Sequence, residues 1–132
     1  MKRKTFLYLF AVTAIDLPGL SGCRVDESLI NNLKKTTFLS QILDEQTIHE
    51  IGKSYKVMVP SEKSNEDLAK LILTDRKNKS YVKHFSKTLN KEAIGSFIDE
   101  KIKDDMSNQM TMVVNGWVIA LTEARQCALW AN

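Results

Sequence analysis

Few residues of this chain have the type and spacing that catalysis or metal binding requires. Its two histidines, His49 and His84, lie 35 positions apart, and the carboxylates and cysteines around them do not have the spacing of a zinc or iron site. The adjacent carboxylates Glu66-Asp67 and Asp104-Asp105 point in different directions on a helix, so neither pair can converge on one atom. The five glycines form no phosphate-binding motif. The sequence therefore predicts no metal, no cofactor and no enzymatic activity.

One thiol leaves an enzymatic alternative open. Cys127 could act as the nucleophile of a small hydrolase, but a reactive thiol needs a basic neighbour, and only Arg125 is near it in sequence. Cysteine also packs like a small apolar side chain, so we expect Cys127 to be buried and free. If Cys23 is not modified, a Cys23–Cys127 disulfide is the other reading.

The first residues have the three parts of an export signal. A basic start, Lys2-Arg3-Lys4, precedes the apolar run 5–15, which is too short to span a bilayer. Small residues then lead to a cysteine, and Leu20-Ser21-Gly22-Cys23 resembles the lipobox of bacterial lipoproteins. Residues 3–7 also resemble a twin-arginine motif in which lysine replaces the second arginine, so the export route stays open. We expect residues 1–22 to be a signal peptide, Cys23 to be lipidated, and the protein to be periplasmic and membrane-anchored.

The charge of the chain comes largely from that signal. The formal net charge of the whole sequence is +3, with 19 basic and 16 acidic residues. Removal of residues 1–22 takes away Lys2, Arg3, Lys4 and Asp16, which leaves a net charge of +1. A nearly neutral domain gives no electrostatic reason to expect a nucleic-acid partner.

The rest of the chain predicts a mainly α fold, with a tether and marginal helix over 23–37 and a single small helical domain over 38–132. Capping signals at Thr47, Ser64 and Asn90 each precede an amphipathic run. Gly52 lies inside the first of these runs, where glycine costs about 1 kcal/mol relative to alanine, so it indicates a close contact between helices. The strongest helical pattern places Ile94, Phe97, Ile98, Ile102 and Met106 on one face.

A β-hairpin is expected at 111–120. Two runs rich in β-branched and aromatic residues flank Asn115-Gly116, a pair that suits a turn in which both central residues need positive φ. Thr122 is then expected to cap a last short helix over 123–130. Trp117, Val118, Ile119 and Leu121 could form the inner face of the hairpin.

The C-terminal block carries a resemblance to a known family. Residues 114–129 read VNGWVIALTEARQCAL, and this block, with Ile51-Gly52-Lys53-Ser54-Tyr55 before it, resembles a group of small exported bacterial proteins. They are similar to the small subunits that accompany flavin-dependent sugar, sugar-alcohol or gluconate dehydrogenases. The resemblance implies an accessory role, with a flavoprotein catalytic subunit as partner.

The same block holds the candidate partner-binding residues. Tryptophan anchors interfaces because it buries a large area at small entropic cost, which makes Trp117 and Trp130 candidates. Arg125 lies on the helix between them. The alternative for all three is packing and capping within the chain.

Two functions follow from these observations. The first is a non-catalytic accessory subunit of an exported, membrane-associated dehydrogenase, which aids export, folding or anchoring of the flavoprotein. The alternative is a free-standing periplasmic lipoprotein with a structural or envelope role and no enzyme partner.

Overall fold

The computed structural model describes residues 25–35 and 43–132. The expected signal peptide and Cys23 lie outside these residues. Within them the chain is mainly helical with one antiparallel hairpin near the C-terminus, as predicted. The elements, in chain order, are α2 (Glu27–Lys35), α3 (Glu45–Met58), α4 (Asn65–Ile72), α5 (Val82–Lys87), α6 (Lys91–Ser107), β1 (Thr111–Val114), β2 (Trp117–Ala120) and α7 (Leu121–Ala131).

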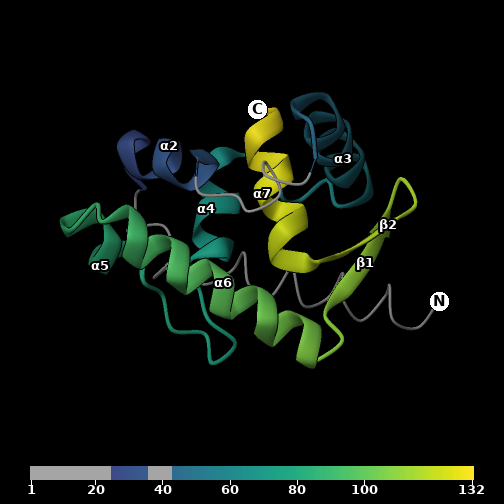
Figure 1. Cartoon of the computed structure of the whole chain (residues 1–132). Coiled ribbons are helices and arrows are strands. Elements are labelled where there is room, and N and C mark those ends of the chain that lie inside the picture. Colours follow the sequence, from purple (N-terminus) through teal and green to yellow (C-terminus); the bar gives the residue numbers. More distant parts are fainter. Residues whose placement is uncertain (1–24, 36–42) are drawn as a thin grey trace.

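Helix α7 is the centre of the fold. Figure 1 shows it in yellow in the middle of the molecule, with α3, α4 and α6 around it, and it contacts each of them. Its side chains Ala124, Cys127, Ala128 and Leu129 have no exposed surface. Because most of these residues are small, neighbouring helices can approach the α7 backbone closely. The last helix, which was expected to be short, therefore lies at the centre of the core.

The closest helix contact lies at Gly52 of α3. A Cβ atom at this position would lie 2.1 Å from the carbonyl oxygen of Cys127 and 2.8 Å from the Cβ of Ala131. Both distances are shorter than van der Waals contact, so no other residue fits here without moving α3 away from α7. The predicted close helix contact at Gly52 is confirmed.

Helix α2 belongs to the same core. Leu29 and Leu33 are fully buried, and the helix contacts both α4 and α7. The predicted division into a tether over 23–37 and a domain over 38–132 thus does not follow the packing, because α2 supplies apolar side chains to the common core. The apolar face predicted for α6 is buried at Ile94 and Ile98, but Met106, in the last turn, is 49% exposed.

Two of the predicted helix caps are confirmed and one is corrected. The Ser64 hydroxyl accepts a hydrogen bond from the Asp67 amide at 3.1 Å, and the Asn90 side chain accepts two at the start of α6. Helix α3, however, begins before Thr47: the Asp44 carboxylate accepts from the Thr47 amide at 2.7 Å. The Thr47 side chain, and after it this amide bond, lower the pKa of Asp44, because hydrogen bonds stabilise the ionised carboxylate.

The predicted hairpin is confirmed with its turn. Strands β1 and β2 pair antiparallel, with Val113 opposite Val118 and Val114 opposite Trp117. Asn115 has φ of 52° and Gly116 of 85°, so both turn residues have the positive φ that an Asn-Gly turn allows. Ile119 is buried, whereas Trp117 and Val118 are exposed, so the run 117–121 does not form one inner face. Side chains alternate between the two faces of a strand, which is why a continuous inner run was wrong.

Candidate functional site

An exposed apolar surface lies on the hairpin. We use the name hairpin surface for Val113, Trp117 and Val118, whose exposed fractions are 60%, 44% and 65%. Val113 and Val118 are cross-strand partners and therefore share the outer face of the ribbon. Trp117 is the partner of buried Val114 and lies beside the turn. Trp117 therefore lies on the side of the ribbon that carries Val114 and Ile119, although it stays exposed, and the outer face itself carries Val113 and Val118.

The hairpin is held firmly against the helical body. Val114 and Ile119 are buried on its inner face. At the turn, the Ser54 hydroxyl of α3 lies 2.8 Å from the side-chain oxygen of Asn115 and donates a hydrogen bond to it. Figure 1 shows the turn beside α3. Because both its base and its tip are attached, the hairpin presents its outer face in one orientation.

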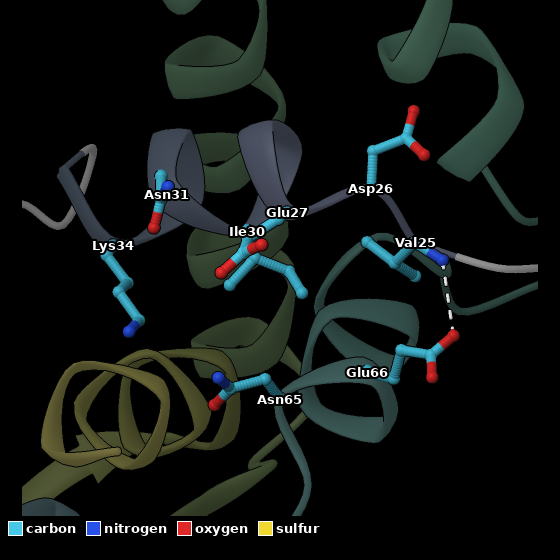
Figure 2. Close-up of a pocket in the computed structure, with 8 residues that line it drawn as sticks. All are labelled: Val25, Asp26, Glu27, Ile30, Asn31, Lys34, Asn65 and Glu66. Carbon is cyan, nitrogen blue, oxygen red and sulfur yellow. Dashed lines mark hydrogen bonds between the residues drawn. The ribbon is translucent and has the colours of Figure 1, made fainter.

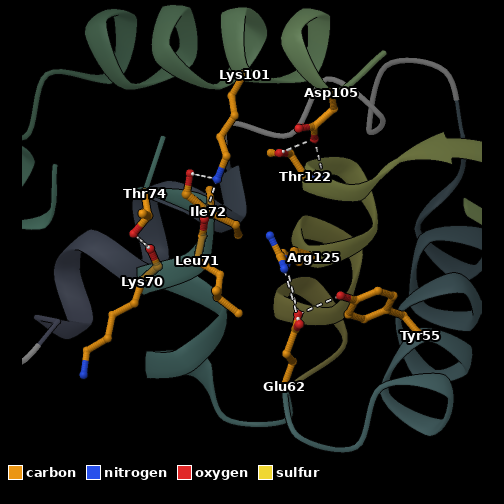
Figure 3. A network of polar contacts seen from close by, with 10 residues as sticks. All are labelled: Tyr55, Glu62, Lys70, Leu71, Ile72, Thr74, Lys101, Asp105, Thr122 and Arg125. Carbon is orange, nitrogen blue, oxygen red and sulfur yellow. Dashed lines mark hydrogen bonds and ion pairs between the residues drawn. The ribbon is translucent and has the colours of Figure 1, made fainter. Parts of the chain in front are cut away.

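Arg125 is engaged inside the protein. Its guanidinium donates to both carboxylate oxygens of Glu62, at 2.9 and 3.3 Å, and the two side chains are only 14% and 16% exposed. The Tyr55 hydroxyl donates to the same carboxylate at 2.6 Å (Figure 3). Burial is the largest single influence on the pKa of Arg125 and lowers it, but the hydrogen bond and charge of Glu62, together with the contribution of Tyr55, outweigh burial and raise the pKa. Burial also raises the pKa of Tyr55. These contacts join α7 to α3 and the segment after it.

Trp130 also contributes to packing. It lies on the last turn of α7, is partly buried, and packs against the core cluster. Of the three residues predicted to bind a partner, only Trp117 is exposed as a large apolar side chain, and the structure does not gather the three into one surface. A partner contact by Arg125 or Trp130 stays a prediction.

The start of α7 is capped from another helix. The Asp105 carboxylate of α6 accepts from the Thr122 amide at 2.8 Å and from its hydroxyl at 2.6 Å, with both residues buried (Figure 3). The Glu123 carboxylate accepts from the Ala120 amide at 2.9 Å. Negative charge is favourable at a helix N-terminus, where amides lack partners. Thr122 therefore donates to the cap and is not the capping residue, which corrects the prediction.

Lys101 reaches from α6 to the end of α4. Its amine donates to the carbonyl oxygen of Ile72 at 2.8 Å and also to that of Leu71 (Figure 3). Burial lowers the pKa of Lys101 to about 7, and the nearby positive charge of Arg125 contributes in the same direction. A neutral amine has two N–H bonds, which matches the two carbonyl acceptors. A lysine with so low a pKa could transfer protons, but here it holds two helices together.

Two further side chains of α7, those of Cys127 and Gln126, are buried. Burial raises the pKa of Cys127 to about 12, with the charge of Glu123 as a second cause, and its thiol has no exposed surface. A protonated, inaccessible thiol does not support the hydrolase alternative. Gln126, 1% exposed, has neither a donor nor an acceptor for its amide among the described residues. No sequence signal pointed to this unpaired amide.

A hollow beside α2 does not bring together side chains that could react with a substrate. It measures about 450 Å³ and lies between α2 and the start of α4 (Figure 2). Across it, the Val25 amide donates to Glu66 at 3.3 Å. The residues that line it are Val25, Asp26, Glu27, Ile30, Asn31, Lys34, Asn65 and Glu66. Within residues 25–35 and 43–132, no cluster of three or more histidine, cysteine or acidic side chains is arranged to hold a metal ion.

Comparisons of the chain with protein-family models, curated proteins and solved structures gave no match. The likeness to dehydrogenase small subunits therefore stays a prediction from the C-terminal motif. Among the helices of the described ranges, none has the length and apolar character needed to cross a membrane.

Proposed function

We propose that this protein is a non-catalytic accessory subunit of an exported, membrane-associated flavin-dependent dehydrogenase. In this role it aids export, folding or anchoring of the flavoprotein. The observation that carries the proposal is the hairpin surface: three large apolar side chains on a projecting element that is fixed at both ends. Because such an element is already ordered, it loses little conformational entropy when it binds a partner, which favours binding.

The distribution of ionisable groups supports a binding role over catalysis. The half-buried and buried groups Glu62, Arg125 and Asp105 are each satisfied by contacts within the chain. Groups engaged in this way hold the helices around α7 and do not converge on an open cavity. The apolar side chains of Val113, Trp117 and Val118, in contrast, are exposed.

The partner class comes from the resemblance, and the anchor from the N-terminal pattern. The C-terminal block is similar to that of small subunits whose partner is a flavoprotein. A lipidated Cys23 would then hold the pair at the periplasmic face of a membrane.

The test is co-purification with a matched pair of variants. The chain is co-expressed in a Gram-negative host with a candidate flavin-dependent dehydrogenase catalytic subunit from the same genome, then purified from the membrane fraction. We expect a yellow complex with the wild type and its loss in Val113→Glu/Val118→Lys. Since the two residues are cross-strand partners, the introduced charges pair with each other and the hairpin keeps its fold.

The control is Leu89→Ser, which removes an apolar side chain that is 43% exposed at the opposite end of the helical body, between α5 and α6. This variant should retain the flavoprotein. Intact mass, with Cys23→Ala for comparison, reports lipidation separately. A lipidated chain that is purified alone contradicts the accessory role and favours the free-standing lipoprotein.

A further inference from the structure

A second exposed surface lies at the C-terminal end of α3. Val57 is 79% exposed there and Met58 53% exposed, next to Lys53, Lys56 and Lys63. We use the name basic tip for these five residues. Large exposed apolar side chains at a helix end, with lysines beside them, match the pattern of residues that enter the headgroup region of a bilayer.

The basic tip carries the positive charge of three lysines. Glu62 is the one acidic residue between positions 53 and 63, and its carboxylate is occupied by Arg125. The pKa of Lys56 is lowered, first by partial burial and then by the charges of Lys53 and Lys34. Lys34 lies on α2 and Lys56 on α3, so lysines of two different helices lie close enough to repel one another. A surface of this kind attracts anionic groups.

The tip lies on the same side of the molecule as the start of the described chain. Asn132 connects the two: Lys34 of α2 donates to its backbone oxygen at 3.4 Å, and Lys56 of α3 donates to its side-chain oxygen. Lys34 also lines the hollow that begins at Val25 (Figure 2). The Asn132 amide donates a hydrogen bond to the side-chain oxygen of Asn65, another residue that lines this hollow, at 2.5 Å.

This placement fits the expected anchor. Two residues of chain span at most about 7 Å, so an acyl group on Cys23 would bring the bilayer within that reach of Val25. The side of the molecule that carries the lysines would then face the headgroups.

We propose that the basic tip binds the surface of a membrane that contains anionic lipids and orients the domain on it. The lysines would contact headgroup phosphates, and Val57 and Met58 would enter the boundary between headgroups and acyl chains. The inference rests on the proposed function only in taking the membrane as the site of action. It needs neither the flavoprotein nor the acyl chain, so it can be tested without either.

The experiment measures partition of the full chain, carrying Cys23→Ala, onto two kinds of vesicle. One is phosphatidylcholine alone and the other contains 30% phosphatidylglycerol. The tip variant is Lys53→Gln/Lys56→Gln/Lys63→Gln, and the matched control, Lys77→Gln/Lys83→Gln/Lys87→Gln, removes the same charge from exposed lysines in and before α5. The N-terminal residues are identical in all three proteins, so their contribution cancels.

On anionic vesicles we expect the tip variant to lose at least tenfold in partition coefficient, since each lysine near such a surface contributes about fivefold. The control should change less than threefold, and on phosphatidylcholine all three proteins should agree. A Val57→Ser/Met58→Ser variant should weaken binding to both vesicles.

Equal losses in the two lysine variants would overturn the proposal, because net charge alone would then explain binding. The proposal would also be overturned if the wild-type protein bound both kinds of vesicle equally but bound polyglutamate through the same three lysines. The partner of the tip would then be an acidic protein. Circular dichroism and thermal melts verify that each variant is folded. Failure here leaves the co-purification result untouched, so the two proposals fail separately.

Discussion

Strand β2 and helix α7 are consecutive in sequence, but β2 exposes two large apolar side chains whereas α7 buries polar ones. In β2, Trp117 and Val118 are 44% and 65% exposed. In α7, Thr122 is 0% exposed and Glu123 is 8% exposed. Burial of polar groups is favourable only when they find partners, and exposure of apolar groups leaves hydrophobic surface in water.

Hydrogen-bond partners explain why the polar groups of α7 can be buried. Thr122 and Glu123 are satisfied within the chain, by Asp105 and by the Ala120 amide. Val113 and Val118 pair with each other across the ribbon and are 60% and 65% exposed. Changes around α7 should therefore cost stability, whereas changes on the hairpin surface should cost binding alone.

The largest effect is expected at the contact between α3 and α7. Gly52→Ala would place a methyl group 2.1 Å from the Cys127 carbonyl oxygen, so the helices must separate. We expect a loss of about 3 kcal/mol in the free energy of unfolding, measured by urea titration. In Gly95→Ala the new Cβ meets nothing within 4 Å, so this control should gain about 0.5–1 kcal/mol. Equal effects at the two glycines would contradict the close contact.

The next effect is expected at the ion pair of α7. Arg125→Met leaves the Glu62 carboxylate with the Tyr55 hydroxyl as its remaining partner. Removal of one member of a buried pair costs 3–5 kcal/mol; because these side chains retain some exposure, we expect about 2 kcal/mol. Partner binding, measured at a temperature where the variant is folded, should be unchanged. A stable variant that no longer binds the flavoprotein would instead indicate that Arg125 contacts the partner.

A smaller effect is expected from the protonation of Lys101. Its pKa is about 7 in the folded chain and 10.5 when unperturbed, so between these values the unfolded chain holds a proton that the folded chain lacks. Stability should then rise with pH above 7 and lose this dependence below it. From pH 7 to pH 8 we expect a gain of about 1 kcal/mol in urea titrations.

Lys101→Met provides the control, since it should lack this gain. The range stops at pH 8 because Cys127, whose folded pKa is raised from 9.0 to about 12, lowers stability once the pH exceeds 9. A wild type with no slope between pH 7 and pH 8 would mean that Lys101 stays charged when folded.

The smallest change in stability is expected on the hairpin surface. Val113→Glu/Val118→Lys replaces two exposed side chains by an opposite-charge cross-strand pair, so the free energy of unfolding should change by less than about 1 kcal/mol. Thermal melts of the isolated protein check this. A large loss would show that the outer face of the hairpin stabilises the fold, and the contrast with α7 would disappear.

Short-range patterns predicted much of the fold. Ser64 and Asn90 cap their helices, and Asn115-Gly116 forms the turn, because each signal depends on a residue and its immediate neighbours. The cap of α3 was misplaced by three residues, since Asp44 and Thr47 both offer a side-chain oxygen and only the packing of α3 selects between them. Of the candidate partner-binding residues, Trp117 proved exposed, whereas Arg125 found Glu62, 63 positions away.

The sequence by itself determined the local features: a mainly helical chain, the hairpin with its Asn-Gly turn, and the need for a small residue at position 52. These follow from backbone conformational preferences and apolar periodicity, which act over a few residues. Only the tertiary structure decided that α7 is central, that Asp105 caps it from α6, and that Lys34 of α2 lies beside the basic tip. Such choices depend on which distant surfaces bury the most apolar area while satisfying their polar groups, and that balance exists only in the folded chain.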